Sequence, residues 1–498
     1  MRARAIQRPH PHLFEISTLP WLERLSAAAG RVVTLGSVPD AEWDRLRVLG
    51  FDLVYLMGVW RRSAIGRQIA RSERRLFEGY DRALPGWTLR DVAGSPYCIA
   101  EYSPDPRVGT WEEIERTREK LHARGMGLVL DFVPNHTGFD HPWIASHPHR
   151  YVTGSLDRFR AAPADFRVVE PPDGEPRFIA CGRDPYFPAW TDVAQLNYFE
   201  PDTRAAMIAE LGAIAERCDG VRCDMAMLVL NDVFARTWAS FAPADAQAAV
   251  PGEFWSAVRA ALPGFLLIAE AYWDLEWRLQ ELGFSFTYDK RLYDRLAHES
   301  SGSVRDHLRA AMAYQNRSAR FLENHDEPRS FATFGPERIE AAATICGASP
   351  GLRFYYDGQF EGRTRFAPVQ LARWADEPEA PGLRGFYDRL LAATGHRVLH
   401  DGDWSLLDVA EAGDATNARL VAFRWRLGDE LHVIVSNPGD QPAQGHVLVG
   451  ADLPGTAPKL MFEDQIRDGR YEWDREALAE RGLYVSLEAG RAHVFHVR

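Results

Sequence analysis

The sequence is poor in cysteine and has no long apolar run. Its 498 residues include five cysteines, an odd number without the spacing of a zinc site or a disulfide framework. No stretch approaches the roughly 20 apolar residues that a membrane-spanning helix needs. The basic start of the chain lacks the apolar segment of a signal peptide. We therefore expect a cytoplasmic protein without a membrane anchor.

The sequence also lacks an excess of positive charge. Its formal net charge is −12 at neutral pH. Because nucleic acids and anionic membranes attract basic surfaces, this balance argues against both as general partners. Hydrophobic residues make up 46% and charged residues 26%, which is ordinary for a globular enzyme. The chain is long enough for more than one domain.

Short apolar runs alternate with helix-like segments through most of the chain. Residues 110–126 show the helical part of the pattern. Thr110 is a favourable N-cap, and Gly125 is a favourable helix end before the next apolar run. The eight predicted strands span residues 13–17, 51–57, 127–133, 220–224, 264–271, 283–288, 318–326 and 351–356. Such alternation predicts an α/β fold with a parallel sheet. Eight units favour a closed (β/α)8 TIM barrel over a doubly wound sheet, which has the same local signals.

Two regions depart from this alternation. About sixty residues separate the third strand from the helix-like segment at Arg204, and a loop of that length is functional or a small domain. After about Gly395, short strands separated by turn residues predict an antiparallel β-sandwich. The predicted division is barrel strands 1–3 in residues 1–136, an insertion in 137–193, the rest of the barrel in 194–395, and a C-terminal sandwich in 396–498.

Residues 218–230, "CDGVRCDMAMLVL", place two charges at the end of a buried strand. Alternate residues of a strand share a face, so Arg222 and Asp224 should emerge together. They form either a structural ion pair or a carboxylate held by an arginine for chemistry. Other strand ends carry Asp131, Glu270 and Asn324-His325-Asp326, and a barrel collects such residues at one mouth. Each alone is more often structural, but together they predict an active site.

Four segments in this order resemble the α-amylase superfamily, the large retaining α-glucoside-active family of glycoside hydrolases (family 13). They are "DFVPNH", "GVRCDMAM", "LLIAEAYW" and "FLENHDEPR". Weaker similarity extends from about Leu13 to Gly362. The resemblance implies a barrel with a loop domain after strand 3 and a trailing sandwich.

The resemblance also implies the catalytic roles. Asp224 would be the nucleophile, Glu270 the acid/base and Asp326 the third carboxylate, which binds sugar hydroxyls. Retaining cleavage needs two carboxyls roughly 5–5.5 Å apart. Arg222 should favour the ionised form of Asp224, whereas burial after an apolar strand should raise the pKa of Glu270.

The remaining expected site residues bind substrate. Tyr97 matches the aromatic residue that stacks under the glucosyl ring, and His136 and His325 would donate to its hydroxyls. Asp131 would organise the neighbouring loop and support His136. Asn135 matches a calcium ligand of many relatives, so no cofactor is predicted but a structural calcium ion stays open.

Two positions depart from the family pattern. Gly94 replaces an aspartate found in many relatives that cleave single glucosyl units, which favours a more open cleft. Met227 and Leu228 replace a Lys-His pair of many α-amylases, so we expect them to make the leaving-group side apolar and to influence specificity.

The prediction is a retaining hydrolase of α-linked glucans or oligosaccharides, with a small-molecule or oligosaccharide substrate as its partner. A transglycosylase or isomerase would share the same carboxylates and differ only in the acceptor. A non-catalytic amylase-like binding protein is disfavoured because Asp224, Glu270 and Asp326 are all present. An unrelated metal-dependent barrel would need His136 and His325 as ligands.

Overall fold

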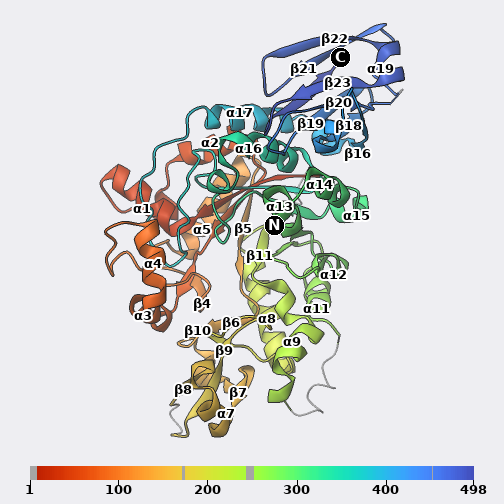
Figure 1. The fold of residues 1–498 in the computed structure, drawn as a ribbon. Coiled ribbons are helices and arrows are strands. Elements are labelled where there is room, and N and C mark those ends of the chain that lie inside the picture. Colours follow the sequence, from red (N-terminus) through yellow and green to blue (C-terminus); the bar gives the residue numbers. More distant parts are fainter. Residues whose placement is uncertain (1–7, 171–173, 243–251, 451) are drawn as a thin grey trace.

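The computed structural model describes residues 8–170, 174–242, 252–450 and 452–498 (Figure 1). Eight parallel strands close a barrel, which confirms the predicted fold class. Around the barrel they are β1 (His12–Ser17), β15 (Leu352–Tyr356), β14 (Ser318–Arg320), β13 (Phe286–Tyr288), β12 (Leu266–Ala269), β11 (Gly220–Cys223), β5 (Gly127–Phe132) and β2 (Leu53–Met57). Each predicted run overlaps one of these strands.

The strand predicted over 318–326 is too long, because β14 ends at Arg320. The following chain turns instead of continuing in the sheet. The side-chain Oδ1 of Asn324 accepts hydrogen bonds from the backbone amides of Asp326 and Glu327, at 2.9 and 3.0 Å. An asparagine that binds backbone amides two and three residues ahead favours a turn over an extended strand.

The helices between the barrel strands begin and end at recognisable signals. The Thr110 side chain accepts from the Glu113 amide, and Glu113 in turn accepts from the Thr110 amide, which makes the predicted cap a capping box. The larger helices are α1 (Thr18–Ala29), α2 (Asp40–Val48), α5 (Trp111–Ala123), α8 (Pro201–Ala215), α9 (Asn231–Trp238), α11 (Phe254–Ala261), α12 (Glu276–Glu281), α13 (Lys290–His298), α14 (Ser301–Leu308), α16 (Ser330–Ala348) and α17 (Leu383–Thr394).

Two insertions extend from the barrel mouth, at the lower left and bottom of Figure 1. The predicted one, after β5, forms a small sheet in the order β6 (His136–Gly138), β10 (Trp190–Gln195), β9 (Arg177–Gly182) and β7 (Thr153–Gly154), with β8 (Phe166–Val169) paired to β9. The other lies between β2 and α5, and the sequence reasoning did not single it out. It contains β3 (Trp60–Arg62), α3 (Ala64–Ser72), α4 (Arg74–Ala83) and β4 (Ile99–Pro104).

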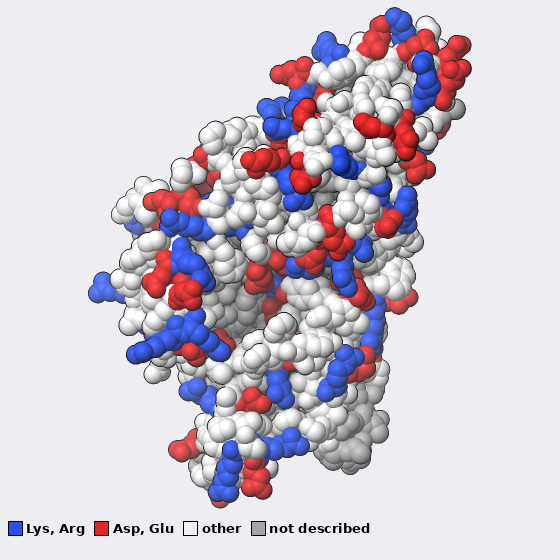
Figure 2. Space-filling view, viewed as in Figure 1, with Lys and Arg blue, Asp and Glu red and all other residues white. Residues whose placement is uncertain are grey.

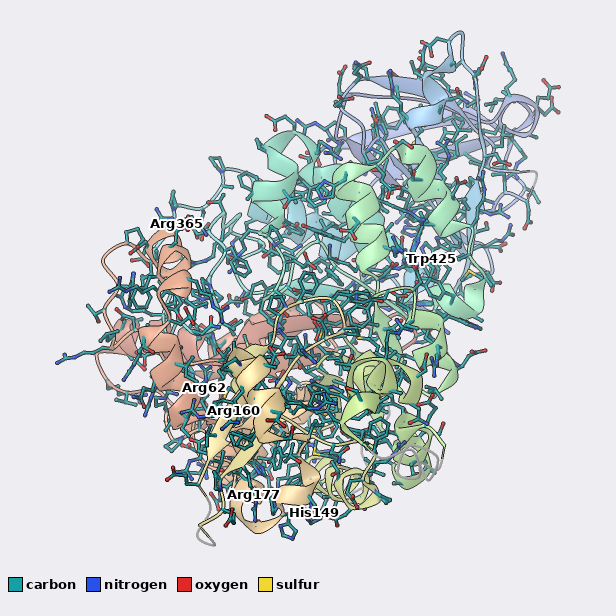
Figure 3. All side chains as sticks on the ribbon, turned by 60° about the horizontal axis from the view of Figure 1, so that its bottom comes forward. Arg62, His149, Arg160, Arg177, Arg365 and Trp425 are labelled. Carbon is teal, nitrogen blue, oxygen red and sulfur yellow. The ribbon has the colours of Figure 1, made fainter. Side chains whose placement is uncertain are left out.

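The C-terminal region consists of antiparallel sheets, as predicted. The larger has the order β16 (Asp403–Leu407), β18 (Val421–Leu427), β19 (Glu430–Ser436), β24 (Ala492–Val497), β21 (Lys459–Asp464) and β22 (Gly469–Asp474). The smaller contains β17 (Val409–Ala410), β20 (Ala443–Val447) and β23 (Leu483–Leu487). Trp425 connects the larger sheet to the barrel, because its Nε1 donates to the Ala348 carbonyl oxygen at 2.7 Å (Figure 3).

No helix within the described ranges is long and apolar enough to cross a bilayer. The first seven residues, which include the basic start considered for a signal peptide, lie outside the described residues.

Candidate active site

A cleft of about 600 Å³ opens where the barrel mouth meets both insertions. Five of the seven predicted site residues line it, namely Tyr97, His136, Asp224, Glu270 and Asp326. The insertions add Arg75 from α4 and Phe187, Trp190 and Asp192 from the segment around β10. Figure 2 shows this face hollowed between the two insertions, with acidic atoms inside the hollow. The volume is within the usual range of small-molecule sites.

Arg222 lies behind the cleft and joins three carboxylates. It is fully buried at 0% exposure. Its Nη1 lies 2.8 Å from Asp224 Oδ1, so the ion pair expected from the strand spacing forms. Its Nη2 lies 2.9 Å from Glu270 Oε2 and 3.5 Å from Asp326 Oδ2. One guanidinium therefore holds residues from three separate strand ends in one cluster.

Both carboxyl oxygens of Glu270 accept a hydrogen bond. Oε2 accepts from the Met225 amide at 2.7 Å, and Oε1 accepts from Tyr272 Oη at 2.9 Å. Met225 has a left-handed backbone with φ 41°, which is uncommon for a residue other than glycine. Burial raises the pKa of Glu270 to about 7, although Arg222 opposes the rise. The direction agrees with the prediction from its apolar strand.

Arg222 favours the ionised form of Asp224, as expected from the sequence, but burial has the larger effect. Burial raises the pKa of Asp224 to about 6 against the attraction of Arg222. The negative charges of Asp326 and Asp131 add to the rise, and Arg222 is shared with Glu270 and Asp326. The pKa of Asp224 still lies below that of Glu270, so it ionises first.

Asp326, His325 and Tyr97 form a hydrogen-bonded group beside Arg222. His325 Nε2 lies 2.9 Å from Asp326 Oδ2 and 2.6 Å from Tyr97 Oη. The rings of Tyr97 and His325 stack at 5.3 Å. Although desolvation opposes it, His325 lowers the pKa of Asp326 below its ordinary value. His325 is buried behind the cleft, whereas the side chain of Asp326 is 43% exposed.

His136 begins β6 and faces the cleft as a neutral ring. Burial lowers its pKa to about 4, and its ring meets that of Trp190 edge-on at 5.5 Å. Asp131 does not support it in the way we expected. Instead, Asp131 accepts from Tyr55 Oη at 2.5 Å and from the Gly58 amide at 2.6 Å, which fixes the loop after β2.

The position considered for calcium does not fit a metal ion. Gln195 Nε2 donates to Asn135 Oδ1 at 3.0 Å, and Asn135 Nδ2 donates to Gln195 Oε1 at 3.3 Å. Both side chains are buried, so the two carboxamides satisfy each other. Within the described ranges, no group of three or more His, Cys, Asp or Glu side chains is arranged to hold a metal.

The two residues expected to influence specificity, Met227 and Leu228, do not line the cleft. Met227 and Leu228 are buried at 0% and 3% exposure, so they cannot form the leaving-group side of the cleft. Met225 lines the cleft instead, because the left-handed residue directs the following chain into the core. Gly94 has φ +87°, and a Cβ there would lie 2.9 Å from Arg67 Cα. Backbone packing alone therefore accounts for this glycine.

Sequence reasoning missed an aromatic rim beside Glu270. Tyr186 and Phe187 are 58% and 66% exposed, and the Tyr186 ring contacts that of Trp273 at 4.9 Å. Trp273 and Asp274 are consecutive left-handed residues with φ of 64° and 62°. Such backbone strain often accompanies functional sites. The signal in the sequence was the aromatic cluster "PYFPAW" in the insertion.

Two carboxylates were also missed. Asp192 on β10 is partly buried and lines the cleft, and desolvation raises its pKa. Glu15 in the middle of β1 is 0% exposed and contacts His325 Nδ1. A charge inside the apolar stretch "HLFEIS" is the same signal that drew attention to Arg222.

Comparison with known proteins points to one family. The family described as "Alpha amylase, catalytic domain" matches residues 46–180. Alpha-amylase MalA of Haloarcula japonica is 26% identical over 363 residues, covering 69% of this chain and 48% of that protein. Alpha-amylase 3 of Dictyoglomus thermophilum is 25% identical over 299 residues, covering 55% and 56%. The chain thus spans about half the length of these curated relatives.

The structural comparison supports the same conclusion for the fold. The crystal structure of an α-amylase from Geobacillus thermoleovorans, complexed with acarbose, matches with a TM-score of 0.65 and 18% identity over 99% of each chain. The overall fold of this chain is therefore similar to that of this enzyme. From the family match and the curated relatives together, we conclude that this chain contains an α-amylase-family catalytic domain.

Proposed function

We propose that the protein is a retaining α-glycoside hydrolase that cleaves α-linked glucans or oligosaccharides through a covalent glycosyl-enzyme intermediate. The observation that carries the proposal is the cluster in which Arg222 contacts Asp224, Glu270 and Asp326 at the cleft. The α-amylase names of the curated relatives support α-glucans as the substrate class.

In the first step, a carboxylate oxygen of Asp224 attacks the anomeric carbon. The glycosidic C–O bond breaks as Glu270 gives its proton to the leaving oxygen, so the sugar becomes an ester of Asp224. In the second step, ionised Glu270 takes a proton from water, and the water oxygen bonds to the anomeric carbon. The ester bond breaks, which restores the Asp224 carboxylate, and the two inversions retain the configuration.

The charge states of the two carboxyls suit these roles. A pKa of about 6 for Asp224 and about 7 for Glu270 leaves a window in which the nucleophile is ionised and the acid is protonated. Activity should therefore rise as the pH increases through about 6 and fall as it increases through about 7. The Tyr272 hydroxyl and the Met225 amide orient Glu270.

The other cleft residues would bind the donor glucosyl unit. Tyr97 presents a ring that can stack on a sugar, and Asp326 presents an exposed carboxylate for hydroxyl groups. His136 is neutral and lines the cleft, so it can donate one hydrogen bond to a hydroxyl. His325 would act through its Nε2, next to Asp326.

A second candidate function is transfer of the glycosyl unit to another sugar, by a transglycosylase or isomerase. The observation that favours it is the aromatic rim of Tyr186, Phe187 and Trp273 next to Glu270. Aromatic rings stack on sugar rings, so this rim offers a place for an acceptor. An acceptor hydroxyl would then replace water in the second step.

Time-resolved product analysis distinguishes the two functions. The purified chain is incubated with maltooligosaccharides, isomaltose, trehalose and sucrose, and the Asp224→Asn variant is the blank for contaminating enzymes. Glucose or shorter oligomers without longer products support the hydrolase. Products longer than the substrate, or a rearranged disaccharide, would support transfer instead. If none of these α-glucosides reacts, the proposed substrate class is wrong.

A further inference from the structure

Glu15 is a buried carboxylate for which the proposed reaction has no role. It lies in the middle of β1, where its backbone pairs with Tyr55 of β2 and Tyr356 of β15. Its side chain is 0% exposed, and Oε2 has no hydrogen-bond partner within the described ranges. Because a buried carboxylate loses its hydration, it needs a compensating partner.

That partner is His325. Oε1 of Glu15 contacts Nδ1 of His325, and Nε2 on the other side of the ring lies 2.9 Å from Asp326 Oδ2. An ionised carboxylate can only accept hydrogen bonds. Nε2 also lies 2.6 Å from Tyr97 Oη, which can accept a hydrogen bond as well as donate one. A ring protonated on both nitrogens, an imidazolium, would donate to a carboxylate on each side. The three residues then form an alternating chain of negative, positive and negative charges.

The surrounding charges favour the same arrangement. Desolvation opposes the charged ring, but Asp326 and Glu15 together raise the pKa of His325 well above its ordinary value. Burial raises the pKa of Glu15, against the attraction of His325 and Arg222. The groups that face this pair from the neighbouring elements are Asp131, Arg222, Tyr288, Tyr356, Asp326 and Tyr97.

We propose that Glu15 is a positioning residue that keeps His325 in its charged form, so that Nε2 always donates beside Asp326. The proposal rests on the proposed function, in which His325 and Asp326 bind the donor sugar. A charged His325 also keeps Asp326 ionised, so that Asp326 accepts hydrogen bonds from sugar hydroxyls. Glu15 acts through His325 and does not contact the cleft itself.

The Glu15→Gln variant tests the proposal, since it keeps the shape and removes the charge. Both the wild type and the variant are labelled with ¹⁵N-histidine, and His325 is assigned by its loss in His325→Gln. We expect His325 in the variant to lose its proton at least about one pH unit lower than in the wild type. The ratio of kcat/KM at about pH 8 to that at about pH 6 should fall as well, because neutral His325 then accumulates at the higher pH.

Glu323→Gln is a matched control. Glu323 is also 0% exposed and lies two residues from His325, but its carboxylate accepts from Arg329 at 2.8 Å and from the Ser330 amide at 2.6 Å. This variant removes a buried charge nearby and should leave the titration of His325 unchanged. If Glu15→Gln and Glu323→Gln leave His325 titrating at the same pH, the proposal is wrong.

The wild-type protein supplies a second test if Glu15→Gln does not fold. The ring nitrogens of His325 should stay at imidazolium shifts up to about pH 8, and neutral-histidine shifts there would overturn the proposal. These titrations need no substrate. A protein inactive on every α-glucoside would therefore refute the proposed function and still decide the role of Glu15.

Discussion

Two buried arginines of the barrel, Arg222 and Arg320, occupy contrasting environments. Both are nearly inaccessible, at 0% and 1% exposure. Arg222 contacts three carboxylates at the cleft. Within the described residues, Arg320 contacts a single carboxylate, that of Asp289, and also contacts Gln315, His307 Nε2 and the Pro350 carbonyl oxygen. Asp289 directly precedes α13, Gln315 ends the short helix α15 (Met312–Gln315) and Pro350 precedes β15, and none of the three lines the cleft.

The difference shows that a buried charge pair alone does not indicate an active site. Burial lowers the pKa of Arg320 to about 10, whereas the partners of Arg222, Glu270 foremost, raise its pKa despite burial. The positive charge of Arg320 is paired with the one carboxylate of Asp289. His307 Nε2 also forms a hydrogen bond with Asp289, at 2.8 Å. Around Arg222 three carboxyls share one guanidinium and line a cleft. This excess of acids at a cleft is the feature on which the proposed reaction depends.

The largest effect on activity is expected from a change at Asp224. Asp224→Asn should lower kcat by at least about a thousand-fold, because the amide cannot form the glycosyl ester. The measurement is the initial rate on the substrate that product analysis identifies. The melting temperature should not fall, since Arg222 keeps Glu270 and Asp326. Near-wild-type turnover would show that the nucleophile is assigned wrongly.

Asp289→Asn removes the corresponding partner of Arg320. We expect the free energy of unfolding to fall by about 3–5 kcal/mol, because the change leaves a buried charge unpaired. Denaturant titration measures this loss. The kcat of the folded variant should stay close to wild type. Activity lost without a loss of stability would mean that the Arg320 cluster is functional and that the contrast with Arg222 is wrong.

Glu270→Gln tests whether the Arg222 cluster costs stability. The pKa of Glu270 rises from 4.5 to about 7 on folding. The contribution of its protonated form to the free energy of unfolding is therefore fully present below about pH 4.5 and is lost as pH rises through about 7. The variant cannot ionise. Its melting temperature should therefore match the wild type near pH 4 and exceed it by a few degrees above pH 7. A difference that does not change with pH would contradict the raised pKa.

The smallest effect is expected from removal of calcium. Asn135 and Gln195 satisfy each other, so a chelator should shift the melting temperature by less than about 1 °C. Differential scanning calorimetry with and without chelator makes the comparison, with Gln195→Ala as the variant expected to lose stability. A large drop in melting temperature on adding the chelator would show that the native protein binds a metal ion.

Much of the fold was readable in the sequence because it depends on local patterns. Apolar runs and helix signals repeat eight times, and each repeat became a strand of the barrel. Strand ends were less predictable. The turn held by Asn324 shortened β14, because side-chain hydrogen bonds there compete with the sheet. The helices α3 and α4 between β2 and α5 are amphipathic but polar on average, so they lack the apolar runs that marked the barrel strands.

The sequence by itself determined the barrel, the antiparallel C-terminal sheets and the set of residues at the strand ends. These follow from the periodicity of apolar residues and from the rule that a barrel gathers strand ends at one mouth. Only the tertiary structure decided which groups share Arg222, why the pKa of Asp224 rises, and that Met227 lies in the core. It also brought Glu15 of the first strand to His325, 310 positions away. Burial and long-range contacts set these properties, and neither is encoded in any local pattern of residues.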